Sequence, residues 1–356
     1  MSNKLASAEK IISLEPIEGA DSIEKATVLG WDVVVKKGEF KVGQLVAYIQ
    51  IDTVAPETEQ FEFLRERKFR VRTIKLRKQI SQGLIVPLPK GIWSEGDDLT
   101  DALQIKKYSK DVETPGIQPK MPKKWYKKLW YILKYRYLVK LFPGLNTFNR
   151  NRFPTGLVPI TDEERIQNMP HILTRYAGKE FVISEKLDGS SITIIHERSM
   201  LGKPRYRICS RRFELFNTKN EWHQVFLDTQ FSNHIQQLVA HFKTNNIIVQ
   251  GEYIGKPQGN KYQLKENEIR LFNIYVNGKR LSQDKFYEAC HSFNIPCCPL
   301  LERTTLNHSL TEIIKYAEGK SVLNKNTERE GVVFRCVEDH LSFKVISNKY
   351  LLINNE

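Results

Sequence analysis

The residues best suited to covalent chemistry are one lysine and three carboxylates that stand beside strand-forming runs. Lys186 precedes Asp188 by two positions, and Glu252 and Glu330 each have a glycine neighbour. Lysine attacks only as a neutral amine, and at its ordinary pKa about one side chain in a thousand is neutral at pH 7.4. We therefore expect a cation close to Lys186, either another lysine or a hydrated divalent metal, and no carboxylate ion-paired with it. Alone, the Lys-x-Asp-Gly string also fits an ordinary turn with solvated charges.

The stretch that carries Lys186 predicts a β-hairpin. Two runs of β-forming residues, Phe181–Ser184 and Ile192–Ile195, flank Asp188-Gly189, which is a strong hairpin turn signal. Lys186 would then lie at the end of a strand, where its long side chain can reach into a cleft.

Four later segments add to this motif. They are IVQGEYI with Glu252, LFNIY with Phe272, EGVVFR with Glu330 and SFKVI with Lys344. Each alone fits a solvated strand-end carboxylate, an ordinary core aromatic or a strand lysine. In this order, they resemble the motifs of the covalent nucleotidyltransferases, the superfamily of ATP-dependent ligases and RNA-capping enzymes.

The resemblance narrows to RNA ligases. Glu185 directly before the lysine, the Ser210-Arg211 pair and the string GEYIGKPQGNKY are similar to RNA ligase motifs. The first hundred residues, with VGQLVAYIQID and QGLIVPLP, are similar to the amino-terminal OB-type domain of one RNA ligase group, in which that domain precedes the nucleotidyltransferase domain. The resemblance implies an ATP-dependent enzyme that seals 3′-hydroxyl and 5′-phosphate RNA ends in RNA repair, through lysyl-AMP on Lys186 and then an RNA-adenylate.

The resemblance also implies roles for the catalytic residues. Lys186 is the nucleophile, and Lys344 neutralises charge that develops on the α-phosphate. Asp188 and Glu330 hold a hydrated Mg²⁺ or Mn²⁺ through water, which orients the amine.

Further residues are implied to hold the nucleotide. Phe272 stacks on the purine, and Glu252 accepts hydrogen bonds from the ribose hydroxyls. Arg211 binds the ribose or a phosphate, and Glu185 contacts adenine. Lys186 and Lys344 complete this nucleotide site.

Two features depart from the family pattern. Many ligases carry a second lysine two residues after the last motif lysine, whereas this chain has Ile346 there and its next lysine is Lys349. The loop after Glu252 is also slightly shorter. Both features bear more on the transfer of AMP to RNA than on the adenylylation of lysine.

An α+β fold in three parts is expected: an OB-like small β-barrel at 1–105, a basic aromatic-rich connector at 106–154 and a nucleotidyltransferase domain with antiparallel sheets at 155–356. Strands of the barrel are expected at Lys10–Leu14, Thr27–Leu29, Trp31–Val35, Leu45–Ile51, Val71–Leu76 and Leu84–Val86. Arg70, Arg72 and Lys75 could line a phosphate-facing surface or a solvated one.

Strands and helices are both expected in the third part. The expected strands are Ile172–Tyr176, Arg205–Ser210, Ile247–Tyr253, Ile269–Val276, Gly331–Val337 and Leu341–Ile346. Helices are expected around Trp222–Phe226 and Ile235–Phe242, at Asp284–Phe293 and at Ser309–Glu318, the last opened by a capping box of Ser309 and Glu312.

The connector interleaves cations with aromatic rings. From Lys120 to Arg152 it contains seven Lys, three Arg and no acidic residue. This pattern suits a strand of nucleic acid, with cations on phosphates and rings on bases. The alternative is a basic amphipathic helix, whose apolar face would dock on the catalytic domain or on a membrane surface: Trp125, Leu129, Ile132 and Leu133.

The composition favours a nucleic-acid partner in a reducing compartment. The net charge is +14, and no long apolar run or lipidation signature favours a membrane instead. The five cysteines form no Cys-x-x-Cys pair, and the eight histidines have no metal-ligand spacing, so we expect no His/Cys metal cage. The start, MSNKLASAEK, lacks an apolar signal core. We expect a cytoplasmic monomer that acts on RNA, possibly a nicked duplex, and not on membranes.

Two other classes of function remain open. A DNA ligase or a capping-type nucleotidyltransferase shares the lysine motif but normally adds an OB domain after it, for which this chain has no room. A non-catalytic RNA-binding protein with a decayed ligase domain is the other class. The intact Lys186, Asp188, Glu252 and Glu330 argue against it.

Overall fold

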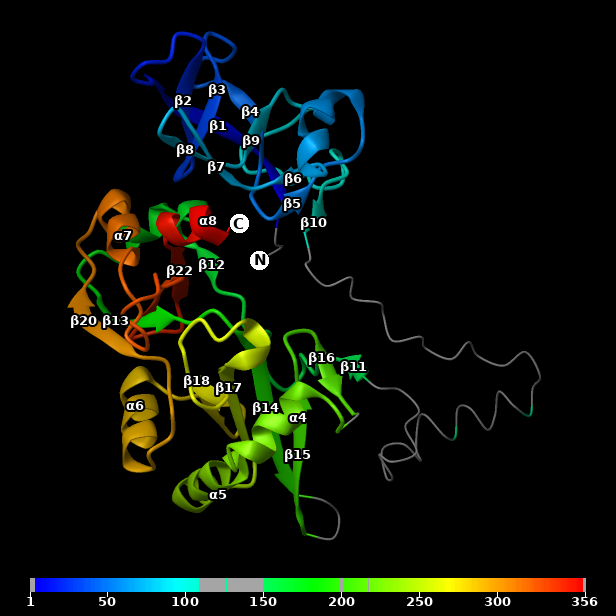
Figure 1. Cartoon of the computed structure of the whole chain (residues 1–356), viewed down its shortest axis with the longest axis vertical. Coiled ribbons are helices and arrows are strands. Elements are labelled where there is room, and N and C mark those ends of the chain that lie inside the picture. The colour runs from blue at the N-terminus through cyan, green and yellow to red at the C-terminus, as the bar shows by residue number, and fades with distance from the viewer. Residues whose placement is uncertain are drawn as a thin grey trace.

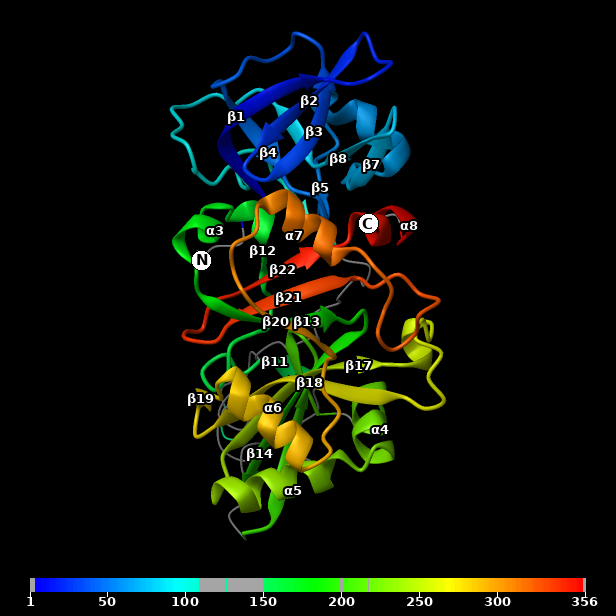
Figure 2. The same cartoon turned by 90° about the vertical axis from the view of Figure 1, so that its left-hand side faces the viewer.

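The chain folds into two bodies, seen in a computed structural model that describes residues 4–108, 126, 133, 150–198, 202–216 and 218–354. A small β-barrel, coloured blue to cyan, sits on a larger domain of two sheets and their covering helices (Figure 1). Helix α8 (Asn348–Asn354) lies between the two bodies in both views (Figures 1 and 2). No helix in the described part of the chain is long and apolar enough to cross a membrane.

The amino-terminal body is a nearly closed antiparallel barrel. Its strands are β1 (Ala6–Pro16), β2 (Ile23–Val28), β3 (Trp31–Lys36), β4 (Leu45–Ile49), β5 (Thr53–Val54), β6 (Arg70–Val71), β7 (Thr73–Leu76), β8 (Gln79–Gln82), β9 (Leu84–Val86) and β10 (Lys106–Lys107). The main sheet has the order β3-β2-β1-β4-β9, and β10-β5-β6 and β7-β8 form smaller sheets. A 3₁₀ helix at Glu59–Arg67 crosses between β5 and β6.

Side chains alternate between buried and partly exposed positions along the barrel strand β3. Along β3, Trp31, Val33 and Val35 are buried and the residues between them are half exposed, as expected for a strand with one face on a core. The OB-like barrel is thus confirmed. The segment Val71–Leu76 is not one strand as predicted, because the chain breaks at Arg72 into β6 and β7 of different sheets.

The second body contains two sheets. The larger has the order β11-β16-β15-β14-β17-β18-β19 and the smaller the order β12-β22-β21-β13-β20. The strands of the larger sheet are β11 (Arg150–Arg152), β14 (Ser190–Arg198), β15 (Pro204–Cys209), β16 (Phe213–Leu215), β17 (Ile247–Ile254), β18 (Glu268–Val276) and β19 (Lys279–Arg280). Those of the smaller sheet are β12 (Glu164–Arg165), β13 (Glu180–Lys186), β20 (Leu300–Thr305), β21 (Gly331–Cys336) and β22 (Ser342–Ile346). Both are antiparallel except for the parallel pair β12–β22.

Helices cover these sheets. They are α3 (His171–Arg175), α4 (Glu221–Asp228), α5 (Phe231–Phe242), α6 (Gln283–Ser292) and α7 (Leu310–Ala317), with short 3₁₀ turns at Ile166–Asn168 and Lys256–Gln258. Helices α4, α5 and α6 share a core with the larger sheet, and α7 packs on the smaller one. The predicted capping box of Ser309 and Glu312 opens α7.

The predicted strand Ile172–Tyr176 is wrong, because this segment forms α3. Pro170 precedes the helix with helical backbone angles, and proline is well tolerated where a helix begins. Ile172 is the only fully buried residue of the helix. A short helix that lies on a core buries about one residue per turn, whereas a strand would bury every second residue. One buried residue in five fits the helix better.

The predicted hairpin around Asp188-Gly189 is also wrong. Strand β13 pairs with β20 and β21 of the smaller sheet, whereas β14 pairs with β15 and β17 of the larger one. Residues 187–189 are therefore the crossover between two sheets rather than a hairpin turn. Lys186 ends one sheet at the seam where the other begins.

The barrel docks on the smaller-sheet side of the second body. The indole N–H of Trp31 donates to Asn168 Oδ1 at 2.6 Å, and Arg165 forms an ion pair with Asp52 at 3.0 Å. Tyr350 and Leu351 of α8 are buried in the barrel core beside Trp31. The two bodies thus share one hydrophobic cluster.

The amphipathic-helix and nucleic-acid interpretations of the connector concern residues outside the described part of the chain. Between residues 109 and 149, only Tyr126 and Leu133 are described, both about half exposed. These interpretations therefore stay predictions.

Candidate active site

All eight predicted site residues line one cavity of about 880 Å³ between the two sheets and beneath the barrel: Glu185, Lys186, Asp188, Arg211, Glu252, Phe272, Glu330 and Lys344. Lys186 and Glu185 end β13, and Glu330 stands just before β21 beside it. Glu252 and Phe272 come from β17 and β18 of the other sheet. A cavity of this size is in the range that holds a nucleotide-sized ligand.

At one end of the cavity, Lys186 is surrounded by three carboxylates, which we call the carboxylate cluster: Asp188, Glu252 and Glu330. Lys186 Nζ donates to both oxygens of Glu330, each at 2.6 Å. Burial alone would lower the pKa of Lys186, but Glu330 and Glu252 raise it above its usual value. Burial, reinforced by Glu330 and Asp188, raises the pKa of Glu252 to about 8.

The ion pair of Lys186 with Glu330 corrects the expectation that no carboxylate would pair with this lysine. The Lys186 ammonium is the cation that pairs with Glu330, whereas Asp188 pairs with the Lys261 ammonium. A second cation that neutralised Glu330 would remove the largest force that keeps this lysine protonated.

Two glycines let the strands approach closely enough to form this cluster. A Cβ at Gly189 would lie 2.4 Å from the backbone oxygen of Tyr253 and 2.9 Å from Glu252 Cγ. A Cβ at Gly331 would lie 2.1 Å from the oxygen of Val345. Any larger residue would force these strands apart, which explains the glycines beside Asp188 and Glu330 in physical terms.

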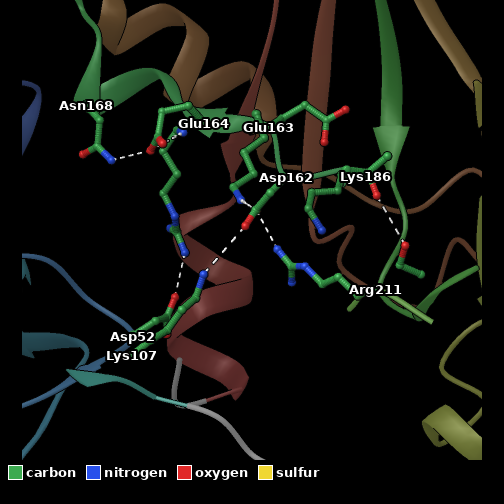
Figure 3. A network of polar contacts seen from close by, with 12 residues as sticks. Asp52, Lys107, Asp162, Glu163, Glu164, Asn168, Lys186 and Arg211 are labelled. Atoms are coloured by element: carbon green, nitrogen blue, oxygen red, sulfur yellow. Dashed lines mark hydrogen bonds and ion pairs between the residues drawn. The ribbon is translucent and has the colours of Figure 1, made fainter. Parts of the chain in front are cut away.

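At the other end of the cavity the charges are reversed, and one acid lies among three cations, which we call the cation cluster. Asp162 is 3.2 Å from Lys344 Nζ, 2.6 Å from Arg211 and 3.7 Å from Lys107 of the barrel (Figure 3). Although burial opposes ionisation, these cations lower the pKa of Asp162 to about 2. Burial lowers the pKa of Lys344, and Arg165 and Lys186 lower it further.

A buried arginine, Arg335, lies at the side of the cavity that carries Phe272. Arg335 lies 5.8 Å from the ring centroid of Phe272, and it donates to Ser184 Oγ at 2.9 Å and to Glu163 Oε1 at 3.0 Å. Glu185 accepts from the Val322 N–H through Oε2 at 2.8 Å. Within the described residues its other oxygen, Oε1, is buried without a hydrogen-bond donor, so it can accept from a ligand.

A metal site of direct protein ligands is not formed, since no group of three or more His, Cys, Asp or Glu side chains in the described residues has that geometry. The donors that are present in the carboxylate cluster are hard carboxylate oxygens. This donor set fits a hydrated Mg²⁺ or Mn²⁺ held through water, as the sequence predicted.

Comparisons with known proteins agree with this geometry. A family model described as an OB-fold domain matches residues 5–88, and one described as RNA ligase matches residues 179–350. The structure of a Naegleria gruberi RNA ligase with PPi is 31% identical, with a TM-score of 0.78, and the match covers 98% of both chains. The chain belongs to the RNA ligase family.

Two further structures of the Naegleria gruberi enzyme match this ligase almost equally well. A variant with ATP and Mn and a variant with AMP and Mn are each 30% identical, with a TM-score of 0.77 and 98% coverage of both chains. No curated protein matches the chain significantly.

The departure at Ile346 has a structural role in this ligase. Ile346 is 4% exposed and packs in the hydrophobic cluster that joins the barrel to α8. It also reaches the edge of the cavity. Where many ligases carry a lysine, this chain therefore has an apolar contact to the barrel.

Sequence reasoning missed several residues of the cavity. Lys107 lies at the start of the expected connector and Asp162 just after its end, and both line the cavity far from any motif. Lys261 and Tyr350 contact Asp188, Lys261 from within the string GEYIGKPQGNKY and Tyr350 from beyond the last motif. The long range of these contacts left no local signal. Arg70, predicted to face phosphates, lines the cavity and stacks on Tyr108 at 3.7 Å.

Proposed function

We propose that this RNA ligase is ATP-dependent and that it seals 3′-hydroxyl and 5′-phosphate RNA ends through AMP covalently bound to Lys186. The observation that carries the proposal is the single cavity in which Lys186, Glu252, Glu330 and Lys344 meet. The ATP- and Mn-bound structures of the Naegleria enzyme support ATP and a divalent metal as its cofactors.

In the first step, the Lys186 amine attacks the α-phosphorus of ATP. The N–P bond forms, the bond from the α-phosphorus to the bridging oxygen breaks, and pyrophosphate leaves with its electron pair. The ammonium proton of Lys186 must be lost before the attack. Glu330, 2.6 Å from Nζ, is the nearest acceptor for that proton or for a cation that displaces it.

A divalent cation held through water at Glu330 and Asp188 would supply positive charge that lowers the pKa of Lys186 and neutralises the α-phosphate. Burial, together with the nearby Glu330 and Asp188, raises the pKa of Glu252, and a cation would relieve the repulsion between these acids, which supports this assignment. At the other end of the cavity, Lys344 and Arg211 would bind phosphate oxygens. Burial and nearby cations lower the pKa of Lys344, as expected for a cation in need of an anionic ligand.

The adenosine would lie against the larger sheet. Phe272 would stack on the purine, and Arg335 behind it fixes the ring. Glu185 Oε1, a buried acceptor, is suited to an amino group of the base. Glu252, protonated at neutral pH by its raised pKa, can both donate to and accept from ribose hydroxyls.

In the second step, an RNA 5′-phosphate oxygen attacks the phosphorus of lysyl-AMP, and the Lys186 amine leaves. In the third step, an RNA 3′-hydroxyl attacks the 5′-phosphate and AMP leaves. We propose RNA repair as the role, with a nicked duplex as one substrate. We also propose a cytoplasmic monomer with its barrel at 1–105 and its nucleotidyltransferase domain at 155–356.

The test is incubation of the full chain with ATP labelled at the α-phosphate and with Mn²⁺. The expected result is a covalent protein–AMP adduct that persists in denaturing gel electrophoresis and that Lys186→Ala abolishes. Lys179→Ala is the matched control, because Lys179 is exposed and pairs with Glu338 at 3.1 Å outside the cavity. An adduct that survives Lys186→Ala would refute the proposal.

The same assay separates the remaining alternatives. Labelling by GTP rather than ATP would indicate a capping-type enzyme, and sealing of nicked DNA but not RNA would indicate a DNA ligase. RNA binding without any adduct would indicate the non-catalytic protein.

A further inference from the structure

We propose that Tyr350 and Lys261 are positioning residues that fix the Asp188 carboxylate, and that helix α8 thereby makes the active site depend on docking of the barrel. The inference rests on the proposed function, in which Asp188 helps to hold a hydrated metal. Lys261 lies within the string GEYIGKPQGNKY but the resemblance assigns it no role, and Tyr350 lies outside every motif of the site.

The Asp188 carboxylate receives two donors on the same oxygen. The Lys261 ammonium and the Tyr350 hydroxyl both donate to Oδ2 of Asp188. The Asp188 N–H donates to Tyr262 Oη at 2.7 Å, so the backbone is held as well. With the donors on Oδ2, the carboxylate is oriented without the use of Oδ1, which can accept from a water of a hydrated cation.

Lys261 is itself anchored on both sides. Its Nζ donates to Tyr350 Oη at 2.9 Å and to Asn354 Oδ1 at 3.3 Å, both on α8. Its backbone oxygen accepts from Asn324 Nδ2 at 3.0 Å and from Thr327 Oγ1 at 2.8 Å. The ammonium therefore has a fixed place between the lysine motif and the terminal helix.

Tyr350 connects the same carboxylate to the other body. Its side chain is 3% exposed and belongs to the hydrophobic cluster of the barrel, with Trp31, Tyr48 and Leu351. Both views show α8 between the barrel and the smaller sheet (Figures 1 and 2). One residue thus has its ring among barrel side chains and its hydroxyl on the active-site carboxylate. A shift of the barrel would move that hydroxyl.

Removal of such a partner is expected to weaken metal use without loss of the fold. Partners that orient a metal-site ligand typically change metal affinity or activity about 10- to 100-fold. Tyr350→Phe removes only the hydroxyl and keeps the buried ring. We expect it to raise the Mn²⁺ concentration for half-maximal adduct formation about tenfold, with little change in Tm.

Direct Mn²⁺ binding gives a second measurement. The free Mn²⁺ signal in electron paramagnetic resonance, with a non-hydrolysable ATP analogue present, should show a weakening of similar size in Tyr350→Phe. Lys349→Met is the control, because Lys349 lies on the same helix with its side chain 60% exposed and pairs with Glu318. It should leave both titrations unchanged.

Lys261→Met removes the second hydrogen-bond donor to Asp188. It also removes a positive charge that repels a bound metal. We therefore expect a rate about tenfold lower at saturating Mn²⁺ with a smaller change in the half-saturating concentration. Tyr350→Phe with wild-type Tm and wild-type titrations would overturn the proposal. If Tyr350→Phe lowers the Tm, the test rests on Lys261→Met instead. A wild-type rate of adduct formation in Lys261→Met would then overturn the proposal. A wild-type chain that forms no adduct would instead refute the proposed function, and the resonance titration would still test Tyr350.

Discussion

The two ends of the active-site cavity have opposite charge arrangements. The carboxylate cluster places Lys186 among three acids, one of which also pairs with Lys261, and the cation cluster places one acid among three cations. Both central groups are held in their charged forms, since the pKa of Lys186 is raised and that of Asp162 is lowered to about 2. Acidic side chains are therefore in the majority at one end of the cavity and basic side chains at the other.

The difference between the clusters lies in what their central residue does. Lys186 is the proposed nucleophile, so a ligand that binds the surrounding acids also frees the reacting group. Asp162 forms no bond to the substrate in the proposed reaction. It lies between cations whose charge is suited to binding phosphate. A metal nucleotide carries both charges that the cavity lacks, the cation for one end and the anion for the other.

The largest expected effect is on the carboxylate cluster. Glu330→Gln keeps the shape of the side chain and removes the charge that pairs with Lys186. We expect adduct formation to fall about a thousandfold, because both the metal site and the orientation of the amine are lost. Single-turnover kinetics with labelled ATP measure this loss. Glu328→Gln, at the nearby pair with Lys320, is the control, and an equal loss there would contradict the assignment.

The next largest effect is expected in the cation cluster. Lys344→Met removes a cation proposed to neutralise the α-phosphate, and one such donor is typically worth about a hundredfold in rate. The loss should be in the rate constant at saturating ATP more than in ATP affinity. If only the affinity for ATP changed, Lys344 would instead be assigned to contacts with the phosphates of bound ATP before the reaction begins. Lys349→Met serves as the control.

Stability should report the charge state of Glu252. Its folded pKa of about 8 lies above its ordinary value of 4.5, so the folded protein binds an extra proton between these values and loses stability as pH rises. Glu252→Gln does not titrate, so its gain in stability over the wild type should grow from about pH 4.5 to about pH 8 and then level off. Urea unfolding at pH 5, 7 and 9 measures this gain.

The exposed Glu288→Gln provides the baseline for that series. Added Mn²⁺ should reduce the gain, because a cation in the carboxylate cluster lowers the pKa of Glu252. A gain that does not vary with pH would show that Glu252 is ionised in the folded protein.

The smallest effect is expected at Asp162. Asp162→Asn removes the acid at the centre of the cations that we propose to bind phosphate. It should tighten ATP binding about threefold, the size of one partly screened charge. Isothermal titration in the Lys186→Ala background separates binding from reaction. Asp284→Asn, an exposed acid that pairs with Arg303, is the control. Weaker binding would show that Asp162 orients the cations rather than competing with the phosphates.

The sequence predicted the composition of the site better than its architecture. Short strands that end in an acid beside glycine can be recognised locally, because the glycine is required by close strand contacts such as those of Gly189 and Gly331. The eight motif residues all line one cavity, which was the condition for the hypothesis. The assignment of a role to each remains a prediction.

The architecture was less predictable where the local turn residues conflict with the pairing of strands that are far apart in the sequence. Asp188-Gly189 has the residues of a hairpin turn, yet β13 finds better partners in β20 and β21. Strand β20 was missed because most of its residues are exposed and polar, and α8 because its buried side depends on the barrel. Neither feature is encoded in the periodicity of its own segment.

The seam between the sheets gives the reaction a geometric requirement. Glu252 and Phe272 stand on the larger sheet, whereas Lys186, Glu330 and Lys344 stand on the smaller one, and residues 187–189 connect the two directly. Adenosine bound to the first and phosphates bound to the second would tie the sheets together. Nucleotide binding and the relative tilt of the sheets are then thermodynamically linked, so that the substrate itself completes the alignment under which it reacts.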